Sequence, residues 1–374
     1  MSLQAVVIGS GWAGEGHTIA LRAAGVEVVA MCGRTPEPAI AKAKKLGIPN
    51  VRFDWREAVE EFKPHIVSIA TPARPHREMA EAAASLGCHV VCEKPLATNA
   101  RDARAMLTAV ERAGVKHAYC TTSRYGPAVI YGRKLIADGL IGQVREVESI
   151  AHTGDPSQMP FNWFHQLSEG GGLLNNLFTH KFGQVLHVTG GEVVAAAGEA
   201  RRLIERAPVG PRVHDFRELF GPAIYQKSGE PKEWREVDAD FGYTVMIKLR
   251  MPDGHIATAL FQASVGRSPC PDYLALHGTK GTLCLTGPNS PDRIHHFDWE
   301  SRKWEEMPIP QEIMASLPQA DNFVQRDWNH LFREFVADVR GESYAGYPTF
   351  RDGWVAAEII EIARTGQSWI PLPV

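Results

Sequence analysis

The sequence predicts an α/β protein in which a doubly wound parallel sheet is followed by an open, mixed and largely antiparallel sheet. Up to residue 124, short and continuously apolar runs alternate with segments of helical periodicity, as in parallel strands covered by helices on both faces. Beyond residue 142 the strand candidates are longer, alternate apolar with polar positions and are separated by turns. A chain of 374 residues has room for about two domains. We therefore expect domains of residues 1–124 and 125–374.

Apolar runs supply the predicted strands of the first sheet. They are residues 4–9, 26–32, 65–71, 89–92 and 116–121. Segments with a helical period, such as residues 100–114, lie between them.

A glycine-rich turn follows the first of these strands. In "VVIGSGWAG", Gly9, Gly11 and Gly14 form G-x-G-x-x-G directly before a helical run. There the first glycine permits a tight turn, the second lets backbone N–H groups approach a pyrophosphate, and the third lets the helix pack closely on the strand. The helix N-terminus adds partial positive charge, so we favour a dinucleotide-binding loop over a merely flexible turn. Its expected cofactor contacts are Gly9, Gly11, Trp12, Ala13 and Gly14.

The second strand ends in Gly33, Arg34 and Thr35, where an acidic residue would hold the ribose hydroxyls of NAD. An arginine there suits the 2′-phosphate of NADP, and the Thr35 hydroxyl adds a donor. An arginine lying flat on the adenine of either cofactor is the alternative. The sequence thus favours NADP and leaves NAD open.

The second domain begins with a predicted amphipathic helix at residues 124–142, closed by glycines. The strands expected after it are residues 143–154, 242–251, 255–264, 272–278 and 281–287. Residues 207–239, rich in proline, glycine and charge, are interpreted as an excursion from this sheet. Two helices near residues 321–340 and 350–364 close the chain, and we expect them to pack back on the first domain.

An acid, a base and a proline follow the fourth strand, as Glu93, Lys94 and Pro95 in "CEKP". Ligands of open α/β sheets bind beyond the carboxyl ends of the strands. A lysine there can donate to a hydroxyl or carbonyl of a substrate, and partial burial brings its pKa within reach of proton transfer. We expect Glu93 to orient its neighbours or the nicotinamide ribose, and a cis Lys94–Pro95 bond to direct the chain. A solvated strand end is the alternative.

A glycine run opens a second motif, "EGGGLLNNLFTHKFGQVLH" at residues 169–187. A helix there places Asn176 and His180 on one face, four residues apart. A buried core histidine is the alternative. His187 follows seven residues later, but without carboxylates or thiols these three do not make a metal site, so we expect no metal.

Composition narrows the class of protein. The formal net charge is −3, with 44% apolar and 22% charged residues, so we expect neither nucleic acid nor a membrane as a partner. The six cysteines lie mostly in apolar runs without metal-binding spacing and are expected to be reduced. No stretch approaches the roughly 20 apolar residues of a membrane span, and the N-terminus does not resemble a signal peptide. We therefore expect a cytoplasmic protein.

Several segments together resemble one enzyme family. The dinucleotide loop, "TPARPH" (71–76), "EKP" (93–95), "RYGPAV" (124–129), "GLIGQV" (139–144) and the glycine-run helix (170–180) resemble the Gfo/Idh/MocA family of glucose-fructose oxidoreductase, inositol dehydrogenase and rhizopine catabolism proteins. The likeness spans almost the whole chain and is sharpest before residue 185.

The resemblance implies a Rossmann domain that binds NAD(P), then an α/β domain whose sheet often forms an oligomer interface, here of a homodimer or homotetramer. It implies hydride transfer between nicotinamide and a hydroxyl or carbonyl carbon of a sugar, cyclitol or sugar derivative. The catalytic residues it maps onto are Lys94, Asn176 and His180. We assign acid/base work to His180, polarisation of the reacting oxygen or relay of its proton to Lys94, and substrate positioning to Asn176. Many family members carry Asp at position 176, and an amide cannot accept a proton.

Other candidates are less specific. Thr71, Pro72 and His76 are expected to line the cofactor cleft, with a helix-turn role for His76 as the alternative. The expected additional substrate contacts are Arg124, Tyr125, Trp163 and His165; for Trp163 and His165 a core position is the alternative. Two other functions stay open for this fold: a glycosidase that keeps NAD bound, and a nonenzymatic ligand-sensing regulator.

Overall fold

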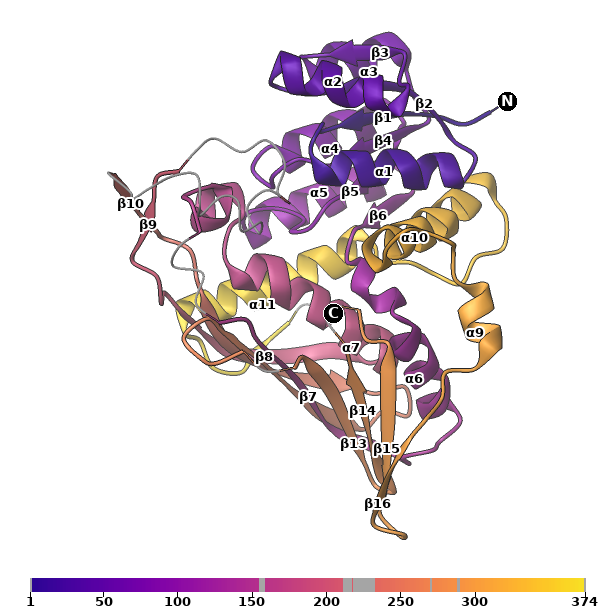
Figure 1. The fold of residues 1–374 in the computed structure, drawn as a ribbon, viewed down its shortest axis with the longest axis vertical. Coiled ribbons are helices and arrows are strands. Elements are labelled where there is room, and N and C mark those ends of the chain that lie inside the picture. Colours follow the sequence, from indigo (N-terminus) through magenta and orange to yellow (C-terminus); the bar gives the residue numbers. More distant parts are fainter. Residues whose placement is uncertain are drawn as a thin grey trace.

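Two sheets, one above the other in Figure 1, organise the chain, of which the computed structural model describes residues 2–154, 159–210, 217, 233–269, 271–287 and 290–372. In this described part the first sheet has six parallel strands in the order β3-β2-β1-β4-β5-β6. Its strands are β1 (Gln4–Ile8), β2 (Glu27–Cys32), β3 (Asn50–Arg52), β4 (Ile66–Ile69), β5 (His89–Cys92) and β6 (His117–Tyr119). The predicted doubly wound sheet is confirmed, with the short edge strand β3 added.

Helices cover both faces of this sheet, which is why its strands are apolar without alternation. They are α1 (Trp12–Ala23), α2 (Pro36–Leu46), α3 (Trp55–Phe62), α4 (His76–Ser85) and α5 (Ala100–Ala113). α1 starts directly after the glycine loop and α5 starts just after the segment that carries Lys94. Both functional loops therefore lie at the carboxyl edge of the sheet.

The second sheet is mixed and mostly antiparallel, as predicted, and has nine strands within the described residues, in the order β16-β15-β14-β13-β7-β12-β11-β8-β17. Its one parallel pair there is β7 with β12. The strands are β7 (Val144–His152), β8 (Glu192–Arg201), β11 (Gly242–Arg250), β12 (Ile256–Ser264), β13 (Tyr273–Gly278), β14 (Gly281–Thr286), β15 (Arg293–Asp298), β16 (Lys303–Glu306) and β17 (Ile370–Pro371). β8 escaped prediction because its run of alanines lacks the bulky β-branched residues typical of strands.

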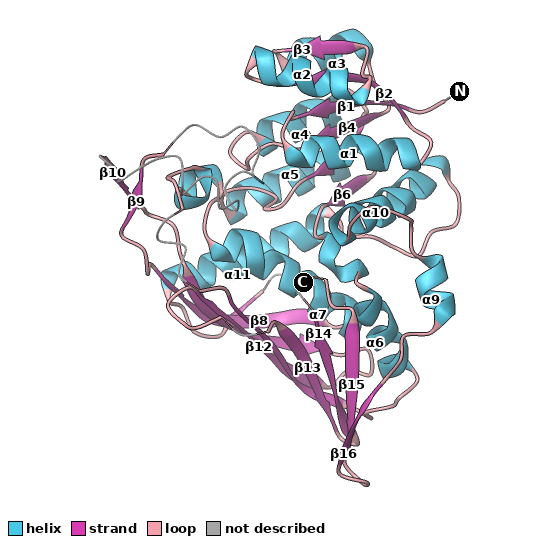
Figure 2. Cartoon of the chain, in the orientation of Figure 1, coloured by secondary structure: helices cyan, strands magenta, loops and turns pink. Residues whose placement is uncertain are grey.

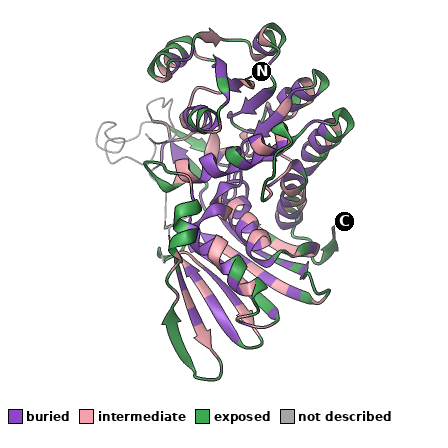
Figure 3. Cartoon of the chain, turned by 90° about the vertical axis from the view of Figure 1, so that its right-hand side faces the viewer, coloured by how far each residue is buried: buried purple, intermediate pink, exposed green. Residues whose placement is uncertain are grey.

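Burial alternates along these strands, in contrast to the first sheet. In β11, Val245 and Ile247 are fully buried, whereas Met246 and Lys248, which alternate with them, are exposed. One face of the sheet packs on helices and the other is open, as the mixed colours of its strands in Figure 3 show.

The region between the two sheets is helical (Figure 2). It contains η1 (Thr122–Tyr125), α6 (Pro127–Ala137), η4 (Leu174–Phe178), α7 (Thr179–Thr189), α10 (Phe323–Arg340) and α11 (Phe350–Thr365). The predicted helix at residues 124–142 is divided, because Pro127, which has no N–H to donate, begins α6 and leaves η1 as a separate turn. The remaining short elements are η2 (Trp163–His165), η3 (Leu167–Glu169), α9 (Gln311–Ser316), β9 (Arg206–Pro208) and β10 (Trp234–Glu236).

The two closing helices return to the first sheet. Trp328 of α10 lies so close to α1 that a Cβ on Gly16 would come within 2.2 Å of its indole. Gly353 of α11 similarly faces Leu96, in the segment that follows Lys94. The division of the chain at residue 124 remains a prediction.

Most of residues 207–239 lies outside the described residues, and β9 pairs with β10 at the two ends of this segment. Among the described cysteines, Cys32, Cys88, Cys92 and Cys120 are buried free thiols and Cys284 is a partly buried one. Cys270 lies outside the described residues. In the described chain, no helix is both long and apolar enough to span a membrane.

Candidate active site

The structure brings Lys94 and Asn176 together, although they lie 82 residues apart in the sequence. The Nζ atom of Lys94 donates to Oδ1 of Asn176 at 3.0 Å. Lys94 directly follows β5 and Glu93, and its bond to Pro95 is cis, as proposed from the sequence. Burial lowers the pKa of Lys94, which the negative charge of Glu93 opposes.

The side-chain amide of Asn176 has a fixed orientation. Its Nδ2 atom donates to the carbonyl oxygens of Gly170 at 3.1 Å and Gly172 at 2.9 Å. Both amide hydrogens are therefore engaged, and only Oδ1 is left to meet Lys94 or a ligand. Gly170 and Gly172 have φ angles of +85° and +92°, which glycine adopts without strain. The carbonyl groups of the glycine run thus orient the Asn176 amide so that its oxygen faces Lys94.

His180 lies one turn beyond Asn176, where η4 has passed into α7. Burial, followed by the positive charge of Lys94, lowers the pKa of His180 to about 3. Its Nδ1 atom is buried and has no hydrogen-bond partner among the described residues. The imidazole is therefore neutral near pH 7 and is able to accept a proton.

The start of the helix that carries Asn176 and His180, formed by η4 and α7, is held by a residue that the sequence did not reveal. Asp240, just before β11, accepts a hydrogen bond from the backbone N–H of Leu174 through Oδ1, at 2.8 Å. Its Oδ2 atom receives two bonds from Arg364 of α11, at 2.7 and 3.0 Å. An aspartate 66 residues from its helix carries no local signal that the sequence reveals.

Glu93 is buried and bonded entirely inside the protein. Its Oε1 atom accepts from Nε2 of His17 and from the indole of Trp328, each at 3.1 Å, and Oε2 accepts from the backbone N–H of Lys94. Burial by itself raises the pKa of Glu93, but the His17 hydrogen bond and the charges of His17 and Lys94 hold it at about 2. Glu93 is therefore an anionic anchor for the loop that carries Lys94.

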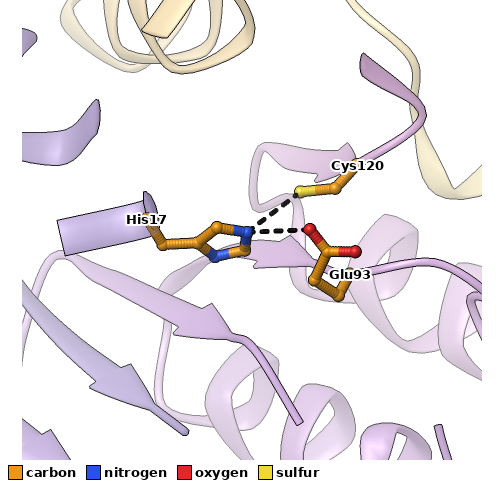
Figure 4. A group of neighbouring side chains, drawn as sticks. All are labelled: His17, Glu93 and Cys120. Carbon is orange, nitrogen blue, oxygen red and sulfur yellow. Dashed lines mark hydrogen bonds and ion pairs between the residues drawn. The ribbon is translucent and has the colours of Figure 1, made fainter. Parts of the chain in front are cut away.

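His17 extends this network into the sheet. Figure 4 shows the His17 ring directed toward Glu93 and Cys120, and Sγ of Cys120 lies 3.7 Å from Nε2 of His17. Nδ1 of His17 pairs with the Ser68 hydroxyl at 2.8 Å. One nitrogen, one oxygen and one sulfur in such proximity resemble metal ligands. However, the histidine and carboxylate already bond to each other, and burial raises the pKa of Cys120 well above its ordinary value, so the thiol is protonated. We interpret the cluster as a hydrogen-bonded network.

The glycine loop fits a dinucleotide. A Cβ on Gly9, whose φ is +126°, would lie 2.3 Å from the carbonyl oxygen of Ala70, and one on Gly14 would lie 1.9 Å from that of Gly9. Gly11 is the N-cap of α1, so the first N–H groups of the helix point out of the loop. The tight turn and the close packing of the helix therefore require glycine at positions 9 and 14, and they place the N-terminus of α1 where it can face a phosphate.

Arg34 and Thr35 lie between β2 and α2, beyond the carboxyl end of the strand. Arg34 is exposed, and the Thr35 side chain makes no capping bond to α2 as the structure describes it. Gly33 is enclosed, because a Cβ there would lie 2.6 Å from Ser10 and from Ala39. This geometry leaves Arg34 free to reach a ribose phosphate or an adenine ring.

The segment of Thr71, Pro72 and His76 supports the Lys94 loop. His76 is fully buried at the start of α4; its Nε2 lies 2.8 Å from the carbonyl oxygen of Thr71, and its Nδ1 lies 3.1 Å from that of Pro95. The His76 side chain therefore connects the loop after β4 with the loop after β5. Thr71 and Pro72 follow β4 at the same sheet edge as the glycine loop.

Two of the four additional substrate contacts predicted from the sequence, Tyr125 and His165, are buried. Arg124 donates to Nδ1 of His187 at 2.6 Å, and Tyr125 is buried and stacked on His330 at 4.2 Å. His165 has no exposed surface and packs against Phe161, whereas Trp163 beside it is only partly buried. Of these residues, Arg124 and Trp163 retain accessible surface.

Two family models match the chain in succession. Residues 3–120 match the oxidoreductase family with an NAD-binding Rossmann fold, and residues 130–284 match the GFO/IDH/MocA C-terminal domain. The chain belongs to the Gfo/Idh/MocA family. It is therefore an oxidoreductase with an NAD-binding Rossmann domain, as the resemblance implied.

Several named Gfo/Idh/MocA relatives are dehydrogenases. Levoglucosan dehydrogenase of Pseudarthrobacter phenanthrenivorans is 29% identical over 300 residues, which cover 75% of this chain and 73% of the relative. Inositol 2-dehydrogenase of Rhizobium meliloti is 29% identical over 208 residues, covering 55% of this chain and 61% of the relative. A structure of levoglucosan dehydrogenase in complex with NADH and levoglucosan superposes with a TM-score of 0.80 at 25% identity, with both chains covered completely.

Proposed function

We propose that this protein oxidises or reduces a hydroxyl-bearing carbon of a sugar, cyclitol or sugar derivative. The contact between Lys94 and Asn176, with His180 one turn away, carries the proposal. Bound NAD(P) would accept or donate the hydride at nicotinamide C4. Relatives named for levoglucosan and inositol support a polyhydroxylated substrate.

Each residue of the site has a separate task in this proposal. The Lys94 ammonium has two N–H groups beyond the one given to Asn176, and it polarises the reacting oxygen. The neutral imidazole of His180 accepts the hydroxyl proton during oxidation and returns it during reduction. Oδ1 of Asn176 accepts a hydrogen bond from a neighbouring substrate hydroxyl, as an aspartate would, because its amide hydrogens are already used.

A dehydrogenase screen tests this function. Polyols, aldoses, inositols and 1,6-anhydro sugars are offered with each nicotinamide cofactor, and formation of reduced cofactor is followed by absorbance. Lys94→Met should lower turnover by about 10² to 10⁴ while leaving cofactor affinity intact, the range of a general acid/base contribution. Cleavage of a glycoside without net cofactor reduction would point to the glycosidase alternative, and binding without turnover to a regulator.

We propose further that NADP is bound more tightly than NAD. An exposed Arg34 and a Thr35 side chain that makes no capping bond within the described chain support this preference, and the segment holds no acid before Glu37. Arg34→Ala should weaken NADPH binding about tenfold and NADH binding little, because a charge-assisted bond to phosphate contributes about 1.5 to 3 kcal/mol. Isothermal titration of both cofactors checks it; an equal loss for both would favour stacking on adenine.

We also propose a cytoplasmic homodimer or homotetramer joined through the open face of the nine-stranded sheet. Exposed Met246 and Ile256 support an interface on this sheet, and the free thiols of the described cysteines suit a reducing compartment.

A further inference from the structure

The C-terminal helix α10 places one side chain against both functional loops. Trp328 is 5% exposed, and its indole N–H donates to Oε1 of Glu93 at 3.1 Å. The same ring lies edge-on to Trp12, inside the glycine loop, with ring centroids 5.3 Å apart. It also packs against His17 at 5.6 Å and fills the space above Gly16.

Glu93 connects Trp328 directly to the backbone of Lys94. Oε2 of Glu93 accepts the backbone N–H of Lys94, so the carboxylate and the peptide unit that carries the lysine hold each other in place. The Nζ atom must then meet Oδ1 of Asn176, on a helix of the second domain, at 3.0 Å. A carboxylate that loses one of its two Oε1 donors is held less firmly, and so is the Lys94 peptide unit bonded to it.

We propose that Trp328 is a positioning residue that aligns the Lys94 loop with the dinucleotide loop. It acts through Glu93 on one side and through ring contacts with Trp12 and His17 on the other. The catalytic role of Lys94 in this inference rests on the proposed function.

Trp328→Phe removes the N–H donor and keeps an aromatic ring. The chain offers a matched control in Trp354→Phe, since Trp354 is also 5% exposed and donates its indole N–H to a glutamate, Glu358, at 2.8 Å. Both variants lose the same group from a buried position, but Glu358 is not attached to a catalytic loop. Urea unfolding of both measures the cost to stability alone.

We expect Trp328→Phe to lower kcat about tenfold with KM changed less than about twofold, and Trp354→Phe to leave kcat unchanged. In a Glu93→Gln background, Trp328→Phe should have little further effect on kcat, because the two side chains act as one unit. Equal losses in the two tryptophan variants, or additive effects with Glu93→Gln, would overturn the proposal.

A second readout needs no substrate. The rate at which an amine-acylating reagent modifies Lys94, followed by peptide mass spectrometry, should rise about threefold or more in Trp328→Phe and not in Trp354→Phe, because the loop opens locally. If the substrate screen finds no turnover, this rate still decides the role of Trp328, and equal rates would refute it. Should Trp328→Phe prove too unstable to purify, Trp328→Tyr removes the same donor and enters the same comparisons.

Discussion

Asn176 shows how a single amide can replace a carboxylate as a hydrogen-bond acceptor. Its two N–H groups are used by the carbonyls of Gly170 and Gly172, so the face it presents to Lys94 is an oxygen. The carbonyl groups of the glycine run therefore fix which side of the Asn176 amide faces Lys94.

Asn176→Asp should destabilise this chain. A carboxylate cannot donate to the carbonyls of Gly170 and Gly172, so the free energy of unfolding at neutral pH should fall by about 1 to 3 kcal/mol. The Lys94 ammonium would attract the new carboxylate, but the two glycine carbonyls would still face it without a donor. Urea unfolding of both proteins at about pH 8 checks it. The absence of a deficit would contradict the fixed orientation of the amide.

In the direction of hydroxyl oxidation, the pH dependence of kcat/KM should lack a transition from His180 between about pH 5 and pH 8. Burial and Lys94 lower the pKa of His180 to about 3, so the imidazole of the free enzyme stays neutral throughout this range. In the direction of carbonyl reduction, activity should fall at higher pH as Lys94 loses its proton, at a pKa below the ordinary 10.5 because the amine is buried. A transition near pH 6.5 that His180→Ala abolishes would show a solvated imidazole instead.

At the scale of elements, the helix that carries Asn176 and His180 begins in an unusual way. Its first turn, η4, is a π-helical turn with Gly172 before it, and Asp240 from the edge of the second sheet closes its N-terminal end. A Cβ on Gly172 would lie 2.8 Å from the Asp240 carboxylate, so the glycine makes room for this contact. Arg364 then connects the carboxylate to the last turns of α11.

Asp240→Asn should lower the free energy of unfolding by about 2 to 4 kcal/mol, because the Arg364 guanidinium loses its charged partner in a largely buried setting. Turnover should fall as well, since the start of the helix that carries Asn176 loses part of its anchor. Asp138→Asn is the control: Asp138 pairs with Lys134 where both side chains are 57% exposed, so its loss should cost under about 1 kcal/mol. Thermal unfolding and kcat of both variants test this; equal destabilisation would deny Asp240 a special role.

At the scale of the whole molecule, the two closing helices join the sheets. α10 contributes Trp328, which bonds to Glu93. α11 contributes Arg364, which bonds to Asp240 at the start of the helix that carries Asn176. The geometry of the site therefore depends on the last part of the chain as much as on the glycine loop at its start.

Met246→Asp should convert the proposed oligomer into monomers. Met246 is 38% exposed on the open face of β11, and a carboxylate buried there without a partner would cost several kcal/mol. Met314→Asp on the short helix α9, where the methionine is 41% exposed, is the matched control and should leave the assembly intact. Light scattering after size-exclusion chromatography gives the masses. A parent protein that is monomeric would refute the proposed oligomer.

Local patterns predicted much of this protein because their causes are local. Unbroken apolar runs marked the strands of the first sheet, a glycine-rich turn before a helix marked the dinucleotide loop, and charges at the end of β5 marked Lys94. Several strands were not predicted from the sequence. β3 is short and lies at an edge of its sheet, and β15 and β16 were also not expected.

The sequence by itself therefore determined the fold class, the family and the three residues proposed for catalysis. Only the tertiary structure decided what holds them, because His17, Asp240, Trp328 and Arg364 come from distant parts of the chain and are brought to the site by packing. It also decided the protonation state of His180, since burial and the neighbouring Lys94 set that pKa, and neither is a property of the local sequence.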